Sequence, residues 1–489
     1  MIIPLHEGEP IYRQIYNFLR TAILRGDLAP GSSLPSSRDL AAELNVSRTV
    51  VLNAFEQLIA GGYIEGVRGS GTVVCNGIPK GFSGLSEPDR SEVNSGPPPA
   101  LSQFAQRLLD GLASQPAGPL LVKETHLYDF HYGNREAVDF PHRLWRRLAS
   151  VRMAHAVPTG SPTQGYPPLR EALAGYLART RAVRCEPEQV VIVNGSQQAL
   201  DLLSRLLIDP GDEAVLEEPH YHGARQAFGA AGARLVLCPV DDDGLCVEAL
   251  PQELDRPTRL VYVTPSHQFP TGAILPLARR LALIEWAERR NAYIVEDDYD
   301  GELHYDCHPI EAVQAHDRTG RVIYVGTFSK TLSPELRLGY VVVPRPLLQA
   351  FLAAKWVSDL LASPLLQEIL ADFLREGHYE RHLRRIRKRN ASRRQALIQA
   401  TKLYLGSLAT VAGAKAGMHA VLWLPTVPVG KLSSLVEQAR KLGVLVYSMS
   451  NYYLGPVVRS GILLSFSSLH EDEIHRGIKL LGQAIRSRA

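Results

Sequence analysis

The chain has 489 residues, of which 45% are hydrophobic and 21% charged, so it is long enough for two or three folded domains and is not a wholly disordered protein. Its formal net charge of +3 is too small to indicate nucleic acid or a membrane as a partner by itself. The five cysteines form no C-x-x-C pair and no apolar run spans a bilayer, so we expect no disulfide framework, no zinc site and no membrane segment, and a cytoplasmic location.

Residues 9–75 have the pattern of a compact helical unit that ends in a hairpin. Apolar residues at helical spacing predict a first helix that ends at Gly26, and Ser36 and Ser47 are candidate N-caps of two more helices. Two short β segments around a glycine-rich turn follow. This order is typical of a winged helix-turn-helix, in which one helix enters the major groove of DNA.

Four motifs of this unit resemble the GntR family of regulators: Leu34 to Ala41, Ser47 to Val50, Gly62 to Ile64 and Gly69 to Thr72. The resemblance implies a DNA-binding domain at residues 1–76 that binds a double-stranded operator. The residues implied as DNA contacts are Ser36, Arg38, Ser47, Arg48 and Thr49, with Arg68 and Gly69 at the tip of the wing.

The charge of this unit limits how it can bind DNA. Residues 1–75 hold six arginines, no lysine and seven acidic residues, so affinity should come from a dimer that reads two half-sites. A three-helix protein-interaction module is the alternative interpretation.

A change of composition marks residues 77–124, which are rich in proline and glycine and contain one short helical candidate, 101–112. We predict a flexible linker here and a second domain at 125–489.

Two apolar strands in the second domain, 292–295 and 322–325, lead into polar residues. The first is followed by acids that include Asp297, and the second delivers Thr327, Ser329 and Lys330 to a loop, with Arg337 close behind in the sequence. A lysine beside hydroxyls and an arginine suits a Schiff base to an aldehyde cofactor that carries a phosphate, and an upstream carboxylate can hold a pyridine nitrogen protonated. The combination predicts pyridoxal 5'-phosphate (PLP).

These residues resemble the fold-type I aminotransferases over roughly residues 125–489. The resemblance implies an α/β fold with a large mixed-sheet PLP domain and a smaller C-terminal α+β domain. It implies that Lys330 forms the Schiff base, that Asp297 binds the pyridine nitrogen and that Tyr299 donates to the ring oxygen of the cofactor. Thr327, Ser329 and Arg337 would hold the phosphate. For Lys330 alone, a solvated surface lysine is the alternative.

Other candidates for the cofactor site come from four further segments. Gly195, Ser196 and Gln197 begin a helix after the apolar strand 190–193, where free backbone N–H groups and the helix dipole attract a phosphate. By resemblance, Tyr166 would cross a homodimer interface to the partner's phosphate site. Tyr221 would stack on the pyridine ring, or merely pack. His267 is the candidate to replace the asparagine that usually holds the ring oxygen.

The segment P-S-H-Q-F-P-T-G at 265–272 resembles the MocR subgroup of GntR regulators, which join the two domains described above. Leu463 stands where aminotransferases usually place an arginine that clamps the substrate carboxylate, and Arg459 lies nearby. The basic run from Arg381 to Arg394 is either a solvated helix face or a guide for DNA.

Three functions fit these features. The first is a transcription regulator whose second domain binds PLP, and a small amine or amino acid as effector, and thereby changes DNA binding. The second is a working PLP-dependent aminotransferase with an accessory DNA-binding domain. The third is a dimerisation scaffold without ligand, which would leave the cofactor residues unexplained.

Overall fold

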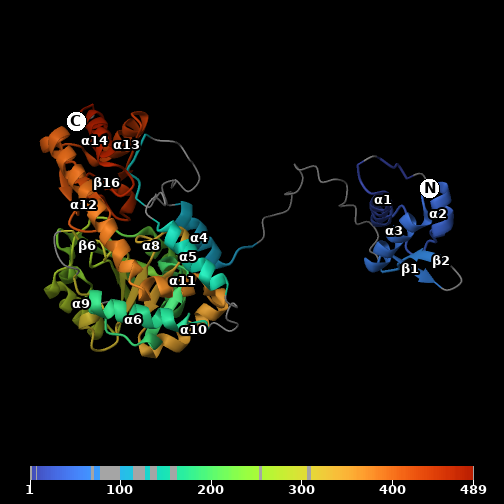
Figure 1. Cartoon of the computed structure of the whole chain (residues 1–489), viewed down its shortest axis with the longest axis horizontal. Coiled ribbons are helices and arrows are strands. Elements are labelled where there is room, and N and C mark those ends of the chain that lie inside the picture. The colour runs from blue at the N-terminus through green and yellow to red at the C-terminus, as the bar shows by residue number, and fades with distance from the viewer. Residues whose placement is uncertain are drawn as a thin grey trace. The chain divides into compact units, whose positions relative to one another are not determined.

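The structure is a computed structural model that describes residues 3–6, 8–67, 71–77, 100–113, 127–132, 140–154, 162–252, 256–305 and 310–487. Contacts between residues divide the chain into two units, Met1–Ala100 and Leu101–Ala489 (Figure 1). Within these described residues, no helix is long and apolar enough to cross a membrane.

The first unit contains the predicted helices and hairpin. Its elements are α1 (Ile11–Arg25), α2 (Ser37–Glu43), α3 (Arg48–Ala60), β1 (Ile64–Val67) and β2 (Gly71–Val74). Gly26 ends α1 in the left-handed conformation, at φ +84°, which glycine adopts without strain. Apolar side chains from all three helices, among them Ile15, Leu40 and Phe55, form one small core. The predicted winged helix-turn-helix is confirmed.

A helix lies inside the segment predicted to be a linker. This helix, α4 (Gln103–Ala113), packs against α8 (His222–Ala231), and Arg107 donates a hydrogen bond of 2.9 Å from Nε to the carbonyl oxygen of Ala230. The second unit therefore begins before residue 125.

A large mixed sheet forms the centre of the second unit. Its strands are, in spatial order, β4 (Val190–Val193), β11 (Gly339–Val342), β10 (Val322–Thr327), β9 (Tyr293–Asp298), β8 (Thr258–Val263), β5 (Glu213–Glu218), β6 (Arg234–Asp241) and β7 (Gly244–Leu245). The strands from β10 to β6 are mutually parallel, whereas β11 is antiparallel to both of its neighbours. Most of the residues in the five strands from β4 to β8 are buried, as expected of a sheet that is covered on both faces.

Helices cover this sheet, as Figure 1 shows. They are α5 (His142–Met153), α6 (Pro167–Arg181), α7 (Ser196–Leu207), α8, α9 (Leu277–Arg290), α10 (Arg345–Asp359) and α11 (Pro364–Arg375). Because β8, β9 and β10 are parallel, their carboxyl ends meet at one edge, where ligands usually bind in such folds.

A smaller sheet follows at the carboxyl end of the chain. It consists of β12 (Thr410–Ala412), β13 (His419–Trp423), β16 (Gly461–Ser465) and β15 (Tyr447–Ser448), in that spatial order. The helices of this part are α12 (His378–Tyr404), α13 (Leu432–Lys441) and α14 (Glu471–Arg486), and β3 (Tyr128–Asp129) pairs with β14 (Val444–Leu445) beside them. The predicted combination of a large mixed-sheet domain and a smaller α+β domain is confirmed.

Candidate cofactor site and nucleic-acid interface

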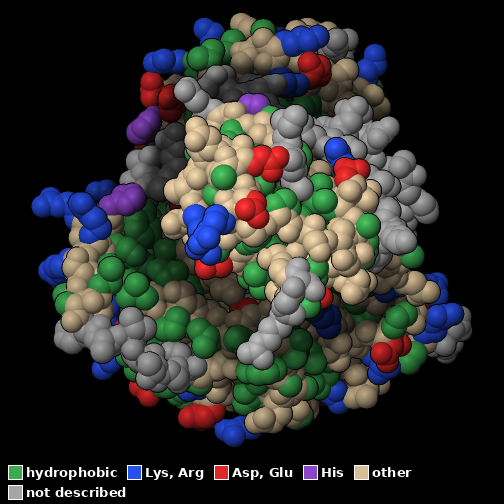
Figure 2. Space-filling model, turned by 90° about the vertical axis from the view of Figure 1, so that its right-hand side faces the viewer, with side chains coloured by type: hydrophobic (Ala, Val, Ile, Leu, Met, Phe, Trp, Pro, Cys, Tyr) green, Lys and Arg blue, Asp and Glu red, His purple; other side chains and the backbone are tan. Residues whose placement is uncertain are grey.

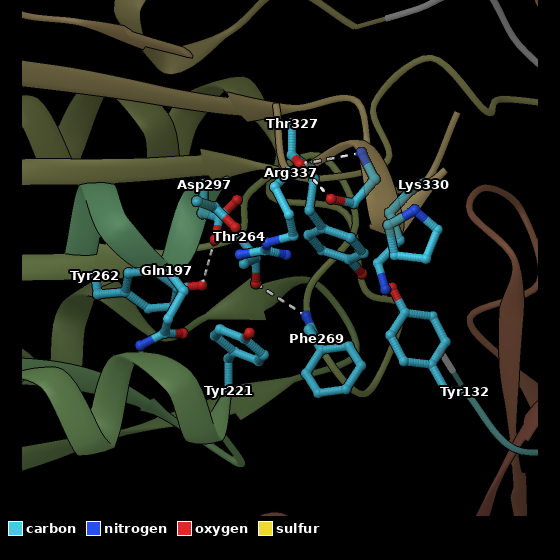
Figure 3. A pocket seen from close by; sticks show the side chains of 14 residues that line it. Tyr132, Gln197, Tyr221, Tyr262, Thr264, Phe269, Asp297, Thr327, Lys330 and Arg337 are labelled. Carbon is cyan, nitrogen blue, oxygen red and sulfur yellow. Dashed lines mark hydrogen bonds between the residues drawn. The ribbon is translucent and has the colours of Figure 1, made fainter. Parts of the chain in front are cut away.

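A cavity lies at the carboxyl ends of β8, β9 and β10, at the edge of the large sheet where ligands usually bind. Most of the predicted cofactor residues line it (Figure 3): Ser196, Gln197, Tyr221, Asp297, Tyr299, Thr327, Ser329, Lys330 and Arg337. The structure thus brings together residues from four strand ends that are far apart in the sequence.

Asp297 is the acid that β9 directs into this cavity. Side chains alternate along a strand, so its neighbours Glu296 and Asp298 point away: Glu296 accepts from backbone N–H groups, and Asp298 binds Arg181 at 2.7 Å. Oδ2 of Asp297 accepts a hydrogen bond of 2.8 Å from the hydroxyl of Tyr262. Oδ1 is buried and has no hydrogen-bond partner. Burial raises the pKa of the Asp297 carboxyl to about 7.

Lys330 approaches the same cavity from the loop after β10. Its Nζ lies 4.3 Å from the centre of the Tyr132 ring, within the distance of a cation–π contact. Tyr132 also lines the cavity, and its own hydroxyl is buried without a hydrogen-bond partner (Figure 3). The amine of Lys330 and the phenol ring of Tyr132 therefore lie next to each other.

The end of the cavity near α7 is suited to an anion. Gly195 is the N-cap of α7 at φ +86°, and a Cβ added to it would meet Nη2 of Arg337 at 2.9 Å. That guanidinium donates to the carbonyl oxygen of Asn194 at 3.0 Å. Thr327 and Ser329 share hydrogen bonds of 3.1 Å in the loop opposite. A helix N-terminus, hydroxyls and a guanidinium are groups that bind phosphate in proteins.

Three predicted cofactor residues are not among those that line this cavity: Gly195, which is the N-cap of α7 beside it, His267 and Tyr166. His267 does not line it, because both of its ring nitrogens are engaged behind Tyr299: Nδ1 lies 2.9 Å from Oδ2 of Asp300, and Nε2 lies 3.0 Å from the carbonyl oxygen of Gly413. The role of His267 in place of the ring-oxygen asparagine therefore stays a prediction, which these two contacts do not support. Tyr166 is half-buried at the start of α6 and does not line the cavity of its own chain.

Several lining residues were not among the predicted cofactor residues, including Tyr132, Tyr262, Thr264 and Phe269. Strand alternation could have found Tyr262, which lies on β8 next to β9 and binds Asp297. Thr264 accepts a hydrogen bond of 2.9 Å from the backbone N–H of Phe269 and so fixes the loop that carries this aromatic wall (Figure 3).

Leu463 occupies the position expected for a carboxylate-binding arginine. It is buried and packs in an apolar cluster with Phe269, Tyr299 and Trp423. Arg459 lies outside the cavity lining, with its guanidinium carbon 4.4 Å from the centre of the Trp423 ring.

Five of the residues predicted to contact DNA lie in the described part of the first unit. Ser36, Arg38, Ser47, Arg48 and Thr49 are all exposed at the starts of α2 and α3. Ser36 caps α2 by accepting from the N–H of Asp39 at 3.2 Å, and Nε of Arg48 donates to Oγ of Ser37 at 3.3 Å. The two helix starts are thereby held together.

The wing tip, with Arg68 and Gly69, lies outside the described residues. On the face drawn in Figure 2, Lys and Arg side chains lie in small separate groups with Asp and Glu between them, in line with the low net charge.

The basic run from Arg381 to Arg394 lies on α12. Part of it anchors the helix, because Arg393 donates to the carbonyl oxygen of Ser467 and Arg394 to that of Ala414. Arg381, Arg384 and Arg385 are exposed. The run is therefore a mixture of structural and solvent-facing arginines.

Comparison with known proteins agrees with both parts of the structure. Residues 11–74 match the family described as bacterial regulatory proteins, gntR family, and residues 132–474 match aminotransferase class I and II. The crystal structure of Pyrococcus horikoshii kynurenine aminotransferase is similar at a TM-score of 0.69 and 30% identity, covering 80% of this chain and 95% of that one. Membership of the aminotransferase class I and II family implies dependence on PLP.

Two relatives match this chain across both parts. A protein of Rhizobium meliloti named "Probable rhizopine catabolism regulatory protein MocR" is 37% identical over 97% of this chain and 94% of its own. The "HTH-type pyridoxine biosynthesis transcriptional regulator PdxR" of Corynebacterium glutamicum is 32% identical over 98% of this chain and 97% of its own. The chain belongs to the GntR family of bacterial transcriptional regulators, in the MocR-like group that joins the DNA-binding domain to an aminotransferase-like domain.

Proposed function

We propose that this regulator binds PLP at the Lys330 site and changes its affinity for an operator in response to PLP, or to an amine or amino acid that reacts with it. The unpaired Oδ1 of Asp297 carries the proposal, since a buried carboxylate oxygen without a donor is costly. The protonated ring nitrogen of PLP is the donor that fits it. Lys330 in the same cavity is the amine that fits the aldehyde.

The other cavity residues fit the remaining parts of the cofactor. Arg337, Thr327, Ser329 and the N-terminus of α7 would bind its phosphate, and the Tyr221 ring would pack against its ring. When bound, PLP supplies an aldehyde that reacts with primary amines and a ring that accepts electrons. The protein orients these groups and excludes water from the buried face of the cavity.

A sensor is favoured over a turnover enzyme by the surroundings of Leu463. An apolar leucine, packed among other apolar side chains, stands where aminotransferases usually have an arginine, and Arg459 lies over the Trp423 ring and not in the cavity lining. The names of the two relatives refer to rhizopine catabolism and pyridoxine biosynthesis, which is consistent with small molecules as signals. Sustained conversion of an amino donor and a keto acid by the purified protein, at enzyme-like rates, would overturn this choice.

A homodimer is part of the proposal. The end of α10 exposes Trp356 at 59% and Val357 at 77%, followed by Leu360 at 54%. Large apolar side chains gathered in this way favour a contact with another protein surface. A second copy would also allow Tyr166 to approach the partner's phosphate site and would give two helix-turn-helix units for two half-sites.

The regulatory mechanism requires that the ligand bind one arrangement of the protein better than another, because only differential affinity shifts operator occupancy. The test is fluorescence anisotropy of the full-length protein on its own upstream DNA at fixed salt, with PLP removed and then restored. A PLP-dependent change in affinity that is absent in Lys330→Ala supports the proposal. Equal affinity with and without PLP, and with amines added, would contradict it.

A further inference from the structure

Behind Tyr299, three buried side chains with metal-binding atoms lie together: His267, Asp300 and His419. Their exposed fractions are 1%, 1% and 0%, and one ligand atom from each lies within 4.8 Å of the other two. None of the three lines the cofactor cavity. They come from different parts of the second unit, since His267 and Asp300 follow β8 and β9 whereas His419 begins β13 of the smaller sheet.

In both histidines the same ring nitrogen, Nε2, contacts a backbone carbonyl oxygen, which leaves Nδ1 of each ring for the cluster. Nε2 of His267 lies 3.0 Å from the carbonyl oxygen of Gly413, and Nε2 of His419 lies 3.2 Å from that of Pro270. Carbonyl oxygens only accept, so each Nε2 carries a proton, and a neutral imidazole then has its lone pair on Nδ1. Histidines that bind metals usually donate their other ring nitrogen to a carbonyl or carboxylate in this way.

Two observations indicate that these lone pairs lack a cation. Nδ1 of His267 lies 2.9 Å from Oδ2 of Asp300, so a neutral histidine would place two acceptors against each other. Nδ1 of His419 is buried and has no hydrogen-bond partner. A proton between His267 and Asp300 would resolve the first conflict but not the second, whereas one metal ion would resolve both.

We propose that His267, Asp300 and His419 bind a single Zn²⁺ ion that joins the large and small domains behind the cofactor site. Two imidazole nitrogens and a carboxylate oxygen are ligands that Zn²⁺ takes in proteins. The hydroxyl oxygen of Tyr299, which lies 3.1 Å from Nδ1 of His267 and donates its proton to the carbonyl oxygen of His267, is the candidate for a fourth ligand. Ligands about 2.1 Å from one ion lie about 3.5 Å apart in a tetrahedral site, so three ligand atoms that all lie within 4.8 Å of one another are near the spacing that one ion requires.

The surroundings show how closely the domains meet here. A Cβ added to Gly417, which follows β12 in the smaller domain, would meet Nδ1 of His267 at 2.3 Å and Oδ2 of Asp300 at 2.4 Å. The N–H of Gly417 donates to the carbonyl oxygen of Leu303 at 2.7 Å. An ion at this point therefore stabilises the contact between the domains and fixes Tyr299 at the edge of the cofactor cavity.

The test uses the full-length, PLP-free protein after dialysis against a chelator. Zn²⁺ is titrated in competition with a chromophoric chelator, and one tight equivalent per chain is expected. His419→Gln and Asp300→Asn should each weaken this equivalent about 100-fold or more, because each removes a ligand. His316→Gln, which alters a partly exposed histidine outside the cluster, is the matched control and should bind as the wild type does.

X-ray absorption of the wild-type zinc complex tests the same site without any variant. A nitrogen and oxygen shell with two imidazoles supports the proposal, whereas sulfur ligands would assign the zinc to cysteines and overturn it. No stoichiometric binding, or equally tight binding by His419→Gln, would overturn it as well. Because PLP is absent from the titration, the result is independent of the function proposed above.

Discussion

The carboxyl group of Asp297 is buried, and its second oxygen has no hydrogen-bond partner. Both conditions disfavour the ionised form of the group. Burial raises its pKa to about 7, and only one of its carboxyl oxygens receives a hydrogen bond, from Tyr262. A cationic donor at the position of Oδ1 would stabilise the charged form and return the pKa toward its ordinary range. Cofactor binding and the ionisation of this one group are therefore linked.

This linkage predicts how the PLP-free protein responds to pH. Because the folded pKa of about 7 lies above the ordinary 3.8, the native state binds the proton more tightly than the unfolded state, and stability falls as pH rises through this window. The amide of Asp297→Asn does not ionise, so this variant does not lose stability as the pH rises. Its stability relative to wild type should therefore improve by about 2 kcal/mol between pH 5.5 and pH 8, measured by urea unfolding.

The same variant should bind PLP more weakly, because an amide does not carry the charge that pairs with the ring nitrogen. Asp242→Asn, which changes an exposed carboxylate on the same domain, is the control for both measurements. A stability difference that does not change with pH would mean that Asp297 is already ionised in the PLP-free protein.

At the scale of elements, the pattern of a strand determines which side chains share a face, and a capping residue marks where a helix begins. Alternation along β9 separates Asp297 from Glu296 and Asp298, and the predicted starts of α2 and α3 agree with the structure to within a residue. The direction of the His267 side chain could not be predicted, because it lies in a loop, where sequence position does not determine where a side chain points. The contact between Tyr132 and Lys330 could not be predicted, because only tertiary packing brings these two distant segments together.

The start of α3 carries a prediction for DNA binding. Arg48 is exposed there, and its Nε is held by Ser37 of α2, so it is positioned before DNA arrives. Arg48→Ala should weaken binding to every sequence if Arg48 meets a phosphate, and should lower the salt dependence of binding by about one ion. Fluorescence anisotropy over a series of salt concentrations measures both effects.

A matched control is Arg13→Ala, which removes an exposed arginine paired with Glu9 on the N-terminal side of α1. It should leave affinity and salt dependence unchanged. If Arg48→Ala instead loses affinity for one operator sequence only, Arg48 reads a base edge and not the backbone.

At the scale of the whole molecule, the two units have different needs for a partner. The first has few basic residues to bind a single half-site tightly, and the second exposes the apolar end of α10. One homodimer would meet both needs, because doubling the DNA contacts compensates for the weak charge of each unit. It would also complete the phosphate site if Tyr166 contributes from the partner.

A change in this surface should therefore alter dimer assembly, DNA binding and cofactor binding together. The change of Trp356 and Val357 to glutamate and aspartate places charges on the exposed apolar surface of α10, and the double variant should sediment as a monomer. Its operator affinity should fall by about 100-fold, as expected when two linked sites become one, and PLP should bind more weakly because the partner's tyrosine is lost.

The control is Leu403→Asp, at an exposed leucine on α12, which should remain dimeric. A double variant that still sediments as a dimer would place the interface elsewhere, and a monomer that keeps full PLP affinity would show that each chain completes its own phosphate site.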